Sequence, residues 1–413
     1  MNNKLIYIAL FVSLLLIPTQ RFNAQIKNSV YSLFGVGQLT DKSFGINKSL
    51  GGTGIAFQSG RSINYLNPAS YLGIAPDSYI MELGLNGLLV KSKQGNISKL
   101  NKDIDFSYAT ASLYFTRWWA FSFGIVPYTT VDYEINSIDQ IGGELTTFNK
   151  TFEGSGGLNK IYWGNSIEII KGLSFGINTC YIFGHILQTE TALADNNFPG
   201  YELTSNRFAG SVYFDYGLQY SLRNDDWFYT VGMIYGANKR FNTTDDLEFT
   251  ADNITTTLSE ENKADIKIPE KYGFGVSIKK GELFRAGVDY EWNKWSDISF
   301  SNASLDSRDS RRYSFGLEYS PSAGEEGKWL STLFYRLGFN YKESYLELNG
   351  TKINSMAMNI GFGIPYDGTS MINLALEYGK EGTTSQGLIE NNFLKVHLNI
   401  SLHQFWETNN FRR

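Results

Sequence analysis

Side chains that commonly perform catalysis or bind metals are rare in this chain. Its 413 residues include three histidines, His185, His397 and His403, and one cysteine, Cys180. His397 and His403 lie six positions apart, on one face of an expected strand, but a zinc site would need a further ligand and none is visible nearby. We therefore interpret them as polar residues of a sheet face and expect no metal site.

One motif is typical of a nucleophilic serine, namely Gly172-Leu-Ser174-Phe-Gly176. A nucleophile elbow requires a sharp strand-to-helix turn, whereas this match opens an expected strand. Cys180 follows in the same strand, on the face opposite Phe175, and is interpreted as a small inward-facing filler. The sequence predicts no enzyme and no cofactor.

Composition narrows the class of protein. The formal net charge of −5 argues against a nucleic-acid partner. After the N-terminus no run approaches 18 apolar residues, which disfavours transmembrane helices. A single cysteine excludes an intrachain disulfide.

The N-terminus has the pattern of a secretory signal peptide at residues 1–24. Lys4 precedes an apolar stretch at 5–17, and Ala24-Gln25 is a plausible cleavage point. Phe22 fits poorly at the third position before that cut, so the cleavage position stays open by several residues. No cysteine stands near the cut, which disfavours a lipoprotein.

Much of the remaining chain alternates with period 2, which is typical of strands with one apolar face. In Phe284–Trp292, for example, one face is wholly apolar or aromatic and the other is Arg285, Gly287, Asp289 and Glu291. Glycine mixed with charge suits a crowded barrel interior, while aromatic residues at strand ends suit membrane interfaces. Periodicity alone leaves a soluble sandwich open.

The connections favour a transmembrane barrel. Fourteen strands are expected near 77–92, 103–116, 118–131, 157–170, 172–187, 206–222, 226–241, 265–279, 282–297, 310–320, 329–344, 351–364, 370–381 and 388–405. Short turns alternate with longer connections over most of this length, as in outer-membrane barrels. We predict an all-β fold: a 14-stranded antiparallel barrel over 77–406, with a short tail at 407–413.

Residues 25–76 precede the first strand and lack this alternation. They contain Gly51, Gly52 and Gly54, and the turn-forming pair Asn67-Pro68. A flexible linker is one interpretation. The other is a compact hatch, or plug, inside the lumen, and a 14-stranded barrel has room for one.

These residues resemble a known family. Ser49-Leu-Gly-Gly-Thr-Gly-Ile-Ala-Phe57, followed by Asn67-Pro68-Ala69, is similar to the N-terminal hatch of FadL-type long-chain fatty-acid transporters. Later stretches resemble Bacteroidetes-type members: Gly154–Trp163, Gly217–Tyr220 and Ile372–Gly379. The chain departs from the common pattern in its tail, because most such barrels end on an aromatic residue.

The resemblance implies a location in the outer membrane of a Gram-negative bacterium, among its lipids, and passive uptake of long-chain fatty acids or other hydrophobic molecules. Cargo would lodge first on apolar residues of the long loops and then against the hatch tip. The candidate ligand-binding residues are Leu193, Phe198, Tyr201, Leu247 and Phe249 in the loops, and Ile26, Val30, Leu33, Phe34 and Val36 in the hatch.

Pro127 interrupts the third expected strand and cannot donate to the sheet. It would mark either a strand end near the membrane surface or a kink that opens a lateral gate in the wall. The resemblance implies the second, because an inward kink of the third strand forms such an opening in that family.

Several charged residues should face the lumen: Arg285, Asp289, Glu291, Glu318, Arg336 and Glu377. They would either pair across strands and fix the hatch or line an ion path. Two further functions stay open, a non-transporting accessory barrel that binds a partner protein in a secretion or assembly complex, and a general porin. A hatch would block a porin.

Overall fold

The computed structural model describes residues 30–33, 36–140, 147–193, 200–252, 254–261, 266–298, 305–321, 329–348 and 350–405. The expected signal peptide at 1–24 and the tail at 407–413 lie outside these ranges. So do Ile26, Phe34 and Phe198, and the side chain of Val30.

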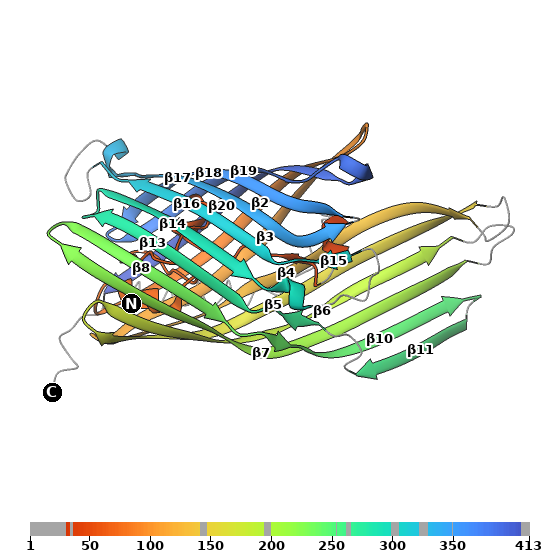
Figure 1. Cartoon of the computed structure of the whole chain (residues 1–413), viewed down its shortest axis with the longest axis horizontal. Helices are drawn as coiled ribbons and strands as arrows, with labels where there is room; N and C mark the ends of the chain where they lie inside the picture. The colour runs from red at the N-terminus through yellow and green to blue at the C-terminus, as the bar shows by residue number, and fades with distance from the viewer. Residues whose placement is uncertain are drawn as a thin grey trace, which may run out of the picture.

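Fourteen antiparallel strands form the closed wall of a barrel (Figure 1). They are β2 (Ser78–Gln94), β3 (Ile97–Thr116), β4 (Trp119–Gln140), β5 (Thr147–Ile170), β6 (Leu173–Ala192), β7 (Tyr201–Asn224), β8 (Trp227–Gly236), β13 (Lys271–Lys280), β14 (Phe284–Asn293), β16 (Ser310–Tyr319), β17 (Phe334–Leu348), β18 (Thr351–Asp367), β19 (Ser370–Gly382) and β20 (Glu390–Phe405). The first and last close the wall, with Ser78 opposite Phe405. The predicted fold class is confirmed.

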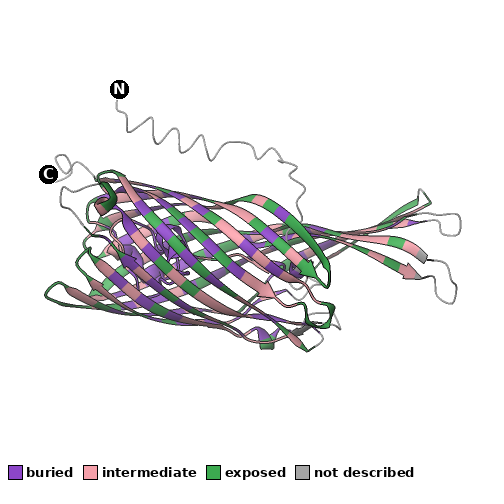
Figure 2. Cartoon of the chain, turned by 90° about the horizontal axis from the view of Figure 1, so that it is seen from above, coloured by how far each residue is buried: buried purple, intermediate pink, exposed green. Residues whose placement is uncertain are grey.

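The two faces of the wall differ as the alternation predicts. Leu374 and Leu376 are 38% and 48% exposed, whereas Ala375 between them is 4% exposed. Figure 2 shows this alternation of exposed and buried positions along the strands. Because a transmembrane strand needs only about 9–11 residues, the longest wall strands reach beyond the thickness of a bilayer.

The expected long loops are largely strands, so that part of the prediction is wrong. β4, β5, β6 and β7 continue past the barrel, and β7 there pairs with β10 (Asn242–Ala251), which pairs with β11 (Ile254–Glu261). These extensions project from one end of the barrel, which we call the long-strand end (Figure 1). We call the opposite end, where for example Asp367 and Ser370 flank a tight turn, the short-turn end. The extensions lie beyond the bilayer, so neither of their faces has to be apolar. Their sequences therefore lack a clean alternation of apolar and polar residues.

Small elements complete the described chain. They are η1 (Val30–Leu33), β1 (Gln38–Leu39), α2 (Gly45–Ser49), η2 (Pro68–Gly73), β9 (Lys239–Arg240), β12 (Lys267–Ile268), η3 (Trp295–Asp297), β15 (Leu305–Ser307), η4 (Trp329–Thr332) and η5 (Ser385–Gly387). Within the described ranges no helix has the length and apolar character needed to cross a membrane.

Candidate functional site

Residues 50–73, the later part of the segment before β2, fill the lumen near the short-turn end. The last turn of this segment, η2, begins where Asn67 accepts a hydrogen bond from the Ala69 N–H at 3.0 Å, with Pro68 in the first helical position. Both choices favour a helix start, since the asparagine satisfies a free N–H and proline has none to lose. The Asn67 side chain also donates to the Ile55 carbonyl at 2.8 Å, and this bond joins two parts of the hatch that are 12 positions apart in the sequence.

Inward glycines of the wall make room for this segment. A Cβ atom at any of them would overlap the hatch: Gly176, Gly217, Gly232, Gly275, Gly287, Gly316 and Gly338. Several are direct cross-strand partners, such as Gly316 and Gly338, so they form a belt around the lumen. We call these seven residues the glycine belt. The prediction that glycine on the polar faces reflects a crowded interior is confirmed.

Carboxylates of the wall hold the hatch backbone. Asp289 accepts hydrogen bonds from the N–H groups of Gly54 at 2.6 Å and Ile55 at 2.9 Å. Glu82 accepts from the Ile63 N–H at 2.9 Å. A buried hydrogen bond contributes about 0.5–1.5 kcal/mol net, and leaving a buried N–H group without its partner costs about 1–3 kcal/mol, so these contacts help to fix the hatch.

Other inward charges pair with one another, as one of the two interpretations expected. Glu318 accepts from Arg285 at 2.7 Å and from Arg336 at 2.6 Å, and all three are buried. Removing one partner from a buried group of ion pairs typically lowers the stability of the folded protein by about 3–5 kcal/mol. Glu377 likewise contacts Lys395 at 3.5 Å.

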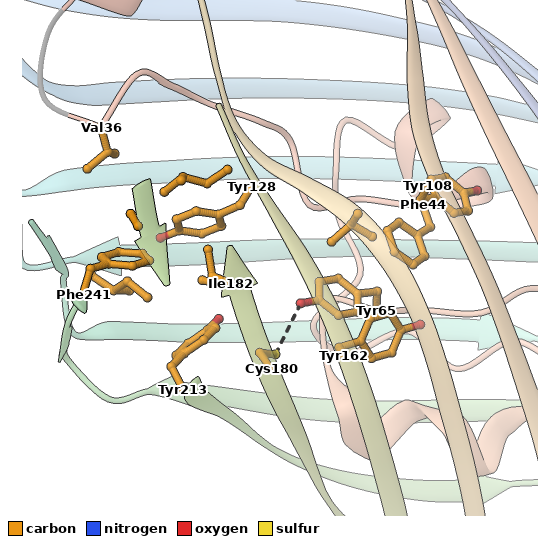
Figure 3. Packing of buried hydrophobic residues seen from close by; sticks show 14 of the residues in the cluster. Val36, Phe44, Tyr65, Tyr108, Tyr128, Tyr162, Cys180, Ile182, Tyr213 and Phe241 are labelled. Carbon is orange, nitrogen blue, oxygen red and sulfur yellow. Dashed lines mark hydrogen bonds between the residues drawn. The ribbon is translucent and has the colours of Figure 1, made fainter. Parts of the chain in front are cut away.

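Aromatic rings join the hatch to the strands that begin the barrel (Figure 3). Phe44 stacks on Tyr108 of β3 with ring centroids 3.9 Å apart, and on Tyr65 at 5.0 Å. The Tyr65 hydroxyl lies 3.9 Å from the sulfur of Cys180. Cys180 is fully buried and faces inward, as predicted.

Beyond the hatch, toward the long-strand end, lies a cavity of about 730 Å³. Its charged lining includes Asp41, Lys48, Glu291, Arg312, Glu377 and Lys395, and its apolar lining includes Leu88, Val90, Phe106, Val126 and Phe393. Asp41 contacts Arg312 at 3.2 Å and Lys48 at 4.0 Å. Burial by itself would raise the pKa of Asp41, but these two cations outweigh it and hold that pKa well below its ordinary value.

The wall beside this cavity is incomplete. β3 and β4 pair only from Thr116 and Trp119 up to Ala109 and Ile125. From Ile97 to Tyr108, β3 pairs with β2 alone. We call this unpaired stretch between β3 and β4 the wall gap. It begins next to a bulge in β4 that directly follows Pro127.

The N-terminal segment takes the place of β3 along the free edge of β4. In β1, Gln38 and Leu39 pair with Thr130 and Thr129 of that strand. Thr40 adds a hydrogen bond from its N–H to the Tyr128 carbonyl at 3.1 Å. The cavity lining includes both Asp105–Ser107 on β3 and Val126–Thr130 on β4, so the cavity reaches both borders of the wall gap.

The residues predicted from the sequence fall into separate places. Tyr201 and Phe249 lie together on β7 and β10, with ring centroids 5.9 Å apart. Leu247 is half-buried on β10, and Leu193 is exposed just after β6. Leu33 packs against Val131 and Tyr133 of β4 and Ile186 of β6.

The hatch-motif glycines also have defined positions. Gly51 and Gly52 adopt positive φ, at 66° and 79°, and lie against Phe339 and Arg312. Gly54 presents its N–H to Asp289, and Ala69 accepts a hydrogen bond from Ser166 at 3.0 Å.

Three features escaped prediction. β1 is only two residues long, and no periodicity shows in so short a strand. Glu82 occurs in an alternating strand where its role as a hatch anchor leaves no local mark. Asp289 was expected to face inward, but nothing in the sequence indicates that its partners are backbone N–H groups. Among the described residues, no cluster of three or more histidine, cysteine or acidic side chains could hold a metal ion.

Comparison with known proteins assigns a family. The family model described as BamG matches residues 1–410. This chain belongs to the BamG family. No curated protein matches the sequence of this BamG-family chain.

Solved structures share its fold. The toluene transporter TbuX of Ralstonia pickettii is 14% identical with a TM-score of 0.60, covering 89% of this chain and 100% of its own. A FadL homologue of Pseudomonas aeruginosa is 10% identical with a TM-score of 0.60, covering 89% and 99%. The monoaromatic hydrocarbon channel CymD is 15% identical with a TM-score of 0.59 over the same shares. At these identities the likeness establishes the fold, and the FadL-type resemblance of the sequence is confirmed at that level.

Proposed function

We propose that this BamG-family barrel lies in the Gram-negative outer membrane and passively transports long-chain fatty acids or other hydrophobic molecules, which leave sideways through the wall gap. In this proposal residues 1–24 are removed, 25–76 form the hatch and 77–406 form the barrel. The short-turn end faces the periplasm, as in other outer-membrane barrels.

The cavity at the wall gap supports this proposal most strongly. In its lining, Leu88, Val90 and Phe393 provide apolar surface, and the cations Lys48 and Lys395 contact the carboxylates Asp41 and Glu377. Such a lining suits a molecule with an apolar tail and a polar head. Each buried methylene contributes about 0.8 kcal/mol, so a long chain needs few polar contacts for binding.

The route would run past β1. Only two residues of β1 pair with β4, so detaching this strand breaks far fewer contacts than separating two wall strands. A hydrophobic molecule that passed there would enter the bilayer without crossing water. In this scheme Leu33 and Val36 lie beside the route, and Pro127 marks its border. Tyr201, Leu247, Phe249 and Leu193 would supply an outer docking surface.

A cross-link across the wall gap tests lateral exit. Cysteines replace Ser107 and Pro127, which both line the cavity, in a Cys180→Ser background. They are then joined by a thiol reagent with a reducible bridge. We expect uptake of a long-chain fatty acid to fall when the link forms and to recover on reduction.

The matched control joins Ala109→Cys to Ile125→Cys, a registered pair just below the wall gap, and should leave uptake unchanged. Full cross-linking at the gap with undiminished uptake would rule out lateral exit.

A second proposal is a non-transporting accessory barrel that binds a partner protein. It is favoured by β10 and β11, which stand outside the wall and expose Ile254 and Leu258. Removing residues 242–261 separates the two proposals. A transporter should keep uptake at saturating cargo, whereas an accessory barrel should lose a co-purifying protein and show no uptake before or after the deletion.

A further inference from the structure

One buried lysine has no place in the transport route described above. Lys160 on β5 points into the barrel and is 1% exposed. Within the described part of the chain, its Nζ has no hydrogen-bond partner. Burying an ammonium group is costly unless it is paired or hydrogen-bonded, so this position needs an explanation.

The neighbouring carboxylate is already engaged. Asp215 of β7 accepts from Lys271 at 2.7 Å and from the hydroxyl of Tyr213. Lys160 is therefore an additional cation beside a neutralised pair, and electrostatic attraction to Asp215 compensates it only in part.

Three aromatic rings surround Lys160 instead. Its Nζ lies 4.6 Å from the ring centre of Tyr65, 5.6 Å from that of Tyr128 and 5.8 Å from that of Tyr213. Burial raises the pKa of Tyr65 well above its ordinary value, so that side chain stays neutral. The contacts are therefore of the cation–π kind, which replace part of the lost hydration but not all of it.

The three rings come from different parts of the molecule. Tyr65 belongs to the hatch, Tyr128 to β4 directly after Pro127, and Tyr213 to β7. Figure 3 shows these three tyrosines around one region of the lumen beside Cys180. If the hatch leaves, the nearest ring goes with it, and water from the cavity can reach Lys160.

From this we propose that Lys160 is a positioning residue that biases the hatch toward release. Its charge is poorly compensated while the hatch is seated and becomes hydrated when the hatch withdraws. The lysine thus keeps the closed state from becoming too stable to open. The inference rests on the proposed function only in that the hatch moves, and it holds whatever the cargo.

Accessibility of a cysteine in the hatch measures release directly. Thr53 is fully buried in the hatch, and its hydroxyl has no hydrogen-bond partner among the described residues, so Thr53→Cys removes no hydrogen bond. Cys180 is replaced by Ala in every variant, because it lies close to Tyr65 and Lys160 and the lysine charge would alter the reactivity of its thiol. The readout is the labelling rate by a water-soluble maleimide in folded protein in lipid.

Lys160→Met keeps the length of the side chain and removes the charge. We expect labelling to slow about tenfold. A tenfold change in the population of the released hatch corresponds to about 1.4 kcal/mol, which is a small part of the cost of burying a charge. Tyr65→Leu removes the closest ring and should accelerate labelling. The acceleration should be much smaller in the Lys160→Met background, because no charge then depends on that ring.

The control is Lys380→Met, the same change at a partly exposed lysine of β19 that pairs with Glu390 at 2.7 Å. It should leave the labelling rate unchanged. If Lys160→Met does not assemble, the cycle is run with Lys160→Gln. Unchanged or faster labelling on loss of the charge, or an equal effect of Tyr65→Leu in both backgrounds, would overturn the proposal. Loss of fatty-acid uptake would bear on the transport proposal alone, because this readout requires no cargo.

Discussion

The two halves of the lumen are built in opposite ways. Near the short-turn end, backbone meets backbone: the glycine belt lets residues 50–68 approach the wall, and Asp289 and Glu82 bind hatch N–H groups. Toward the long-strand end, side chains such as Asp41, Arg312 and Lys395 surround a cavity. Close backbone contacts leave little room for adjustment, whereas charged side chains around a cavity can rearrange with water. The first half is suited to sealing the barrel and the second to accommodating a ligand.

The largest expected effect comes from adding one carbon atom to the belt. In Gly338→Ala, the new Cβ would overlap the backbone at Leu50 and Gly51. Overpacking typically costs about 1–3 kcal/mol, and here the hatch must shift to relieve it. We expect a marked rise in ion conductance in planar bilayers. Gly87→Ala is the control, since a Cβ there meets nothing closer than 4.0 Å; equal conductance in the two variants would contradict a steric seal.

An intermediate effect is expected from Asp289→Asn. The amide oxygen can still accept from Gly54 and Ile55, but the amide NH2 group then takes the place of Oδ1, which is buried without a hydrogen-bond partner among the described residues. We expect the hatch to be destabilised by about 1 kcal/mol, seen as faster hydrogen exchange at these two amides. Asp367→Asn, in an exposed turn, should leave both exchange rates as they are. No change in Asp289→Asn would mean that the belt alone fixes the hatch.

The wall and the existence of a hatch could be predicted from the sequence, because both leave regular marks. Alternation of Leu374, Ala375 and Leu376 reflects lipid on one side and the lumen on the other. The inward glycines are likewise visible in the pattern, and their crowding was expected. Asn67-Pro68 favours a turn in any context, so a turn was expected where η2 begins, although the helical turn itself was not.

The candidate site could be predicted only in outline. Pro127 was identified as an irregular point, and the wall gap begins beside it. However, the gap depends on which strand pairs with β4, and β1 replaces β3 there through two residues without periodicity. Tyr201, Leu247 and Phe249 were expected in loops because the extensions lack an apolar face. Lys160 looks like an ordinary strand lysine until Tyr65, 95 positions earlier in the chain, is placed against it.

The smallest expected effect concerns acid and the cavity half. The pKa of Asp41 in the folded protein is held well below its ordinary value of 3.8 by Arg312 and Lys48, against the opposing effect of burial. The stabilisation from this carboxylate is therefore fully present above about pH 4 and is lost as the pH falls through the depressed folded value. Asp41 follows directly after Thr40, which bonds to Tyr128 at the wall gap. Acidification should thus loosen β1 while the belt and its hatch residues stay in place.

Hydrogen exchange at the Thr40 amide, corrected for its intrinsic pH dependence, should accelerate below about pH 4 relative to that at Ala69. In Asp41→Asn this difference should already be present at neutral pH and should not change on acidification. If acid released Thr40 and Ala69 together, the two halves of the lumen would open as one unit, and the contrast between a steric seal and an adjustable cavity would fail.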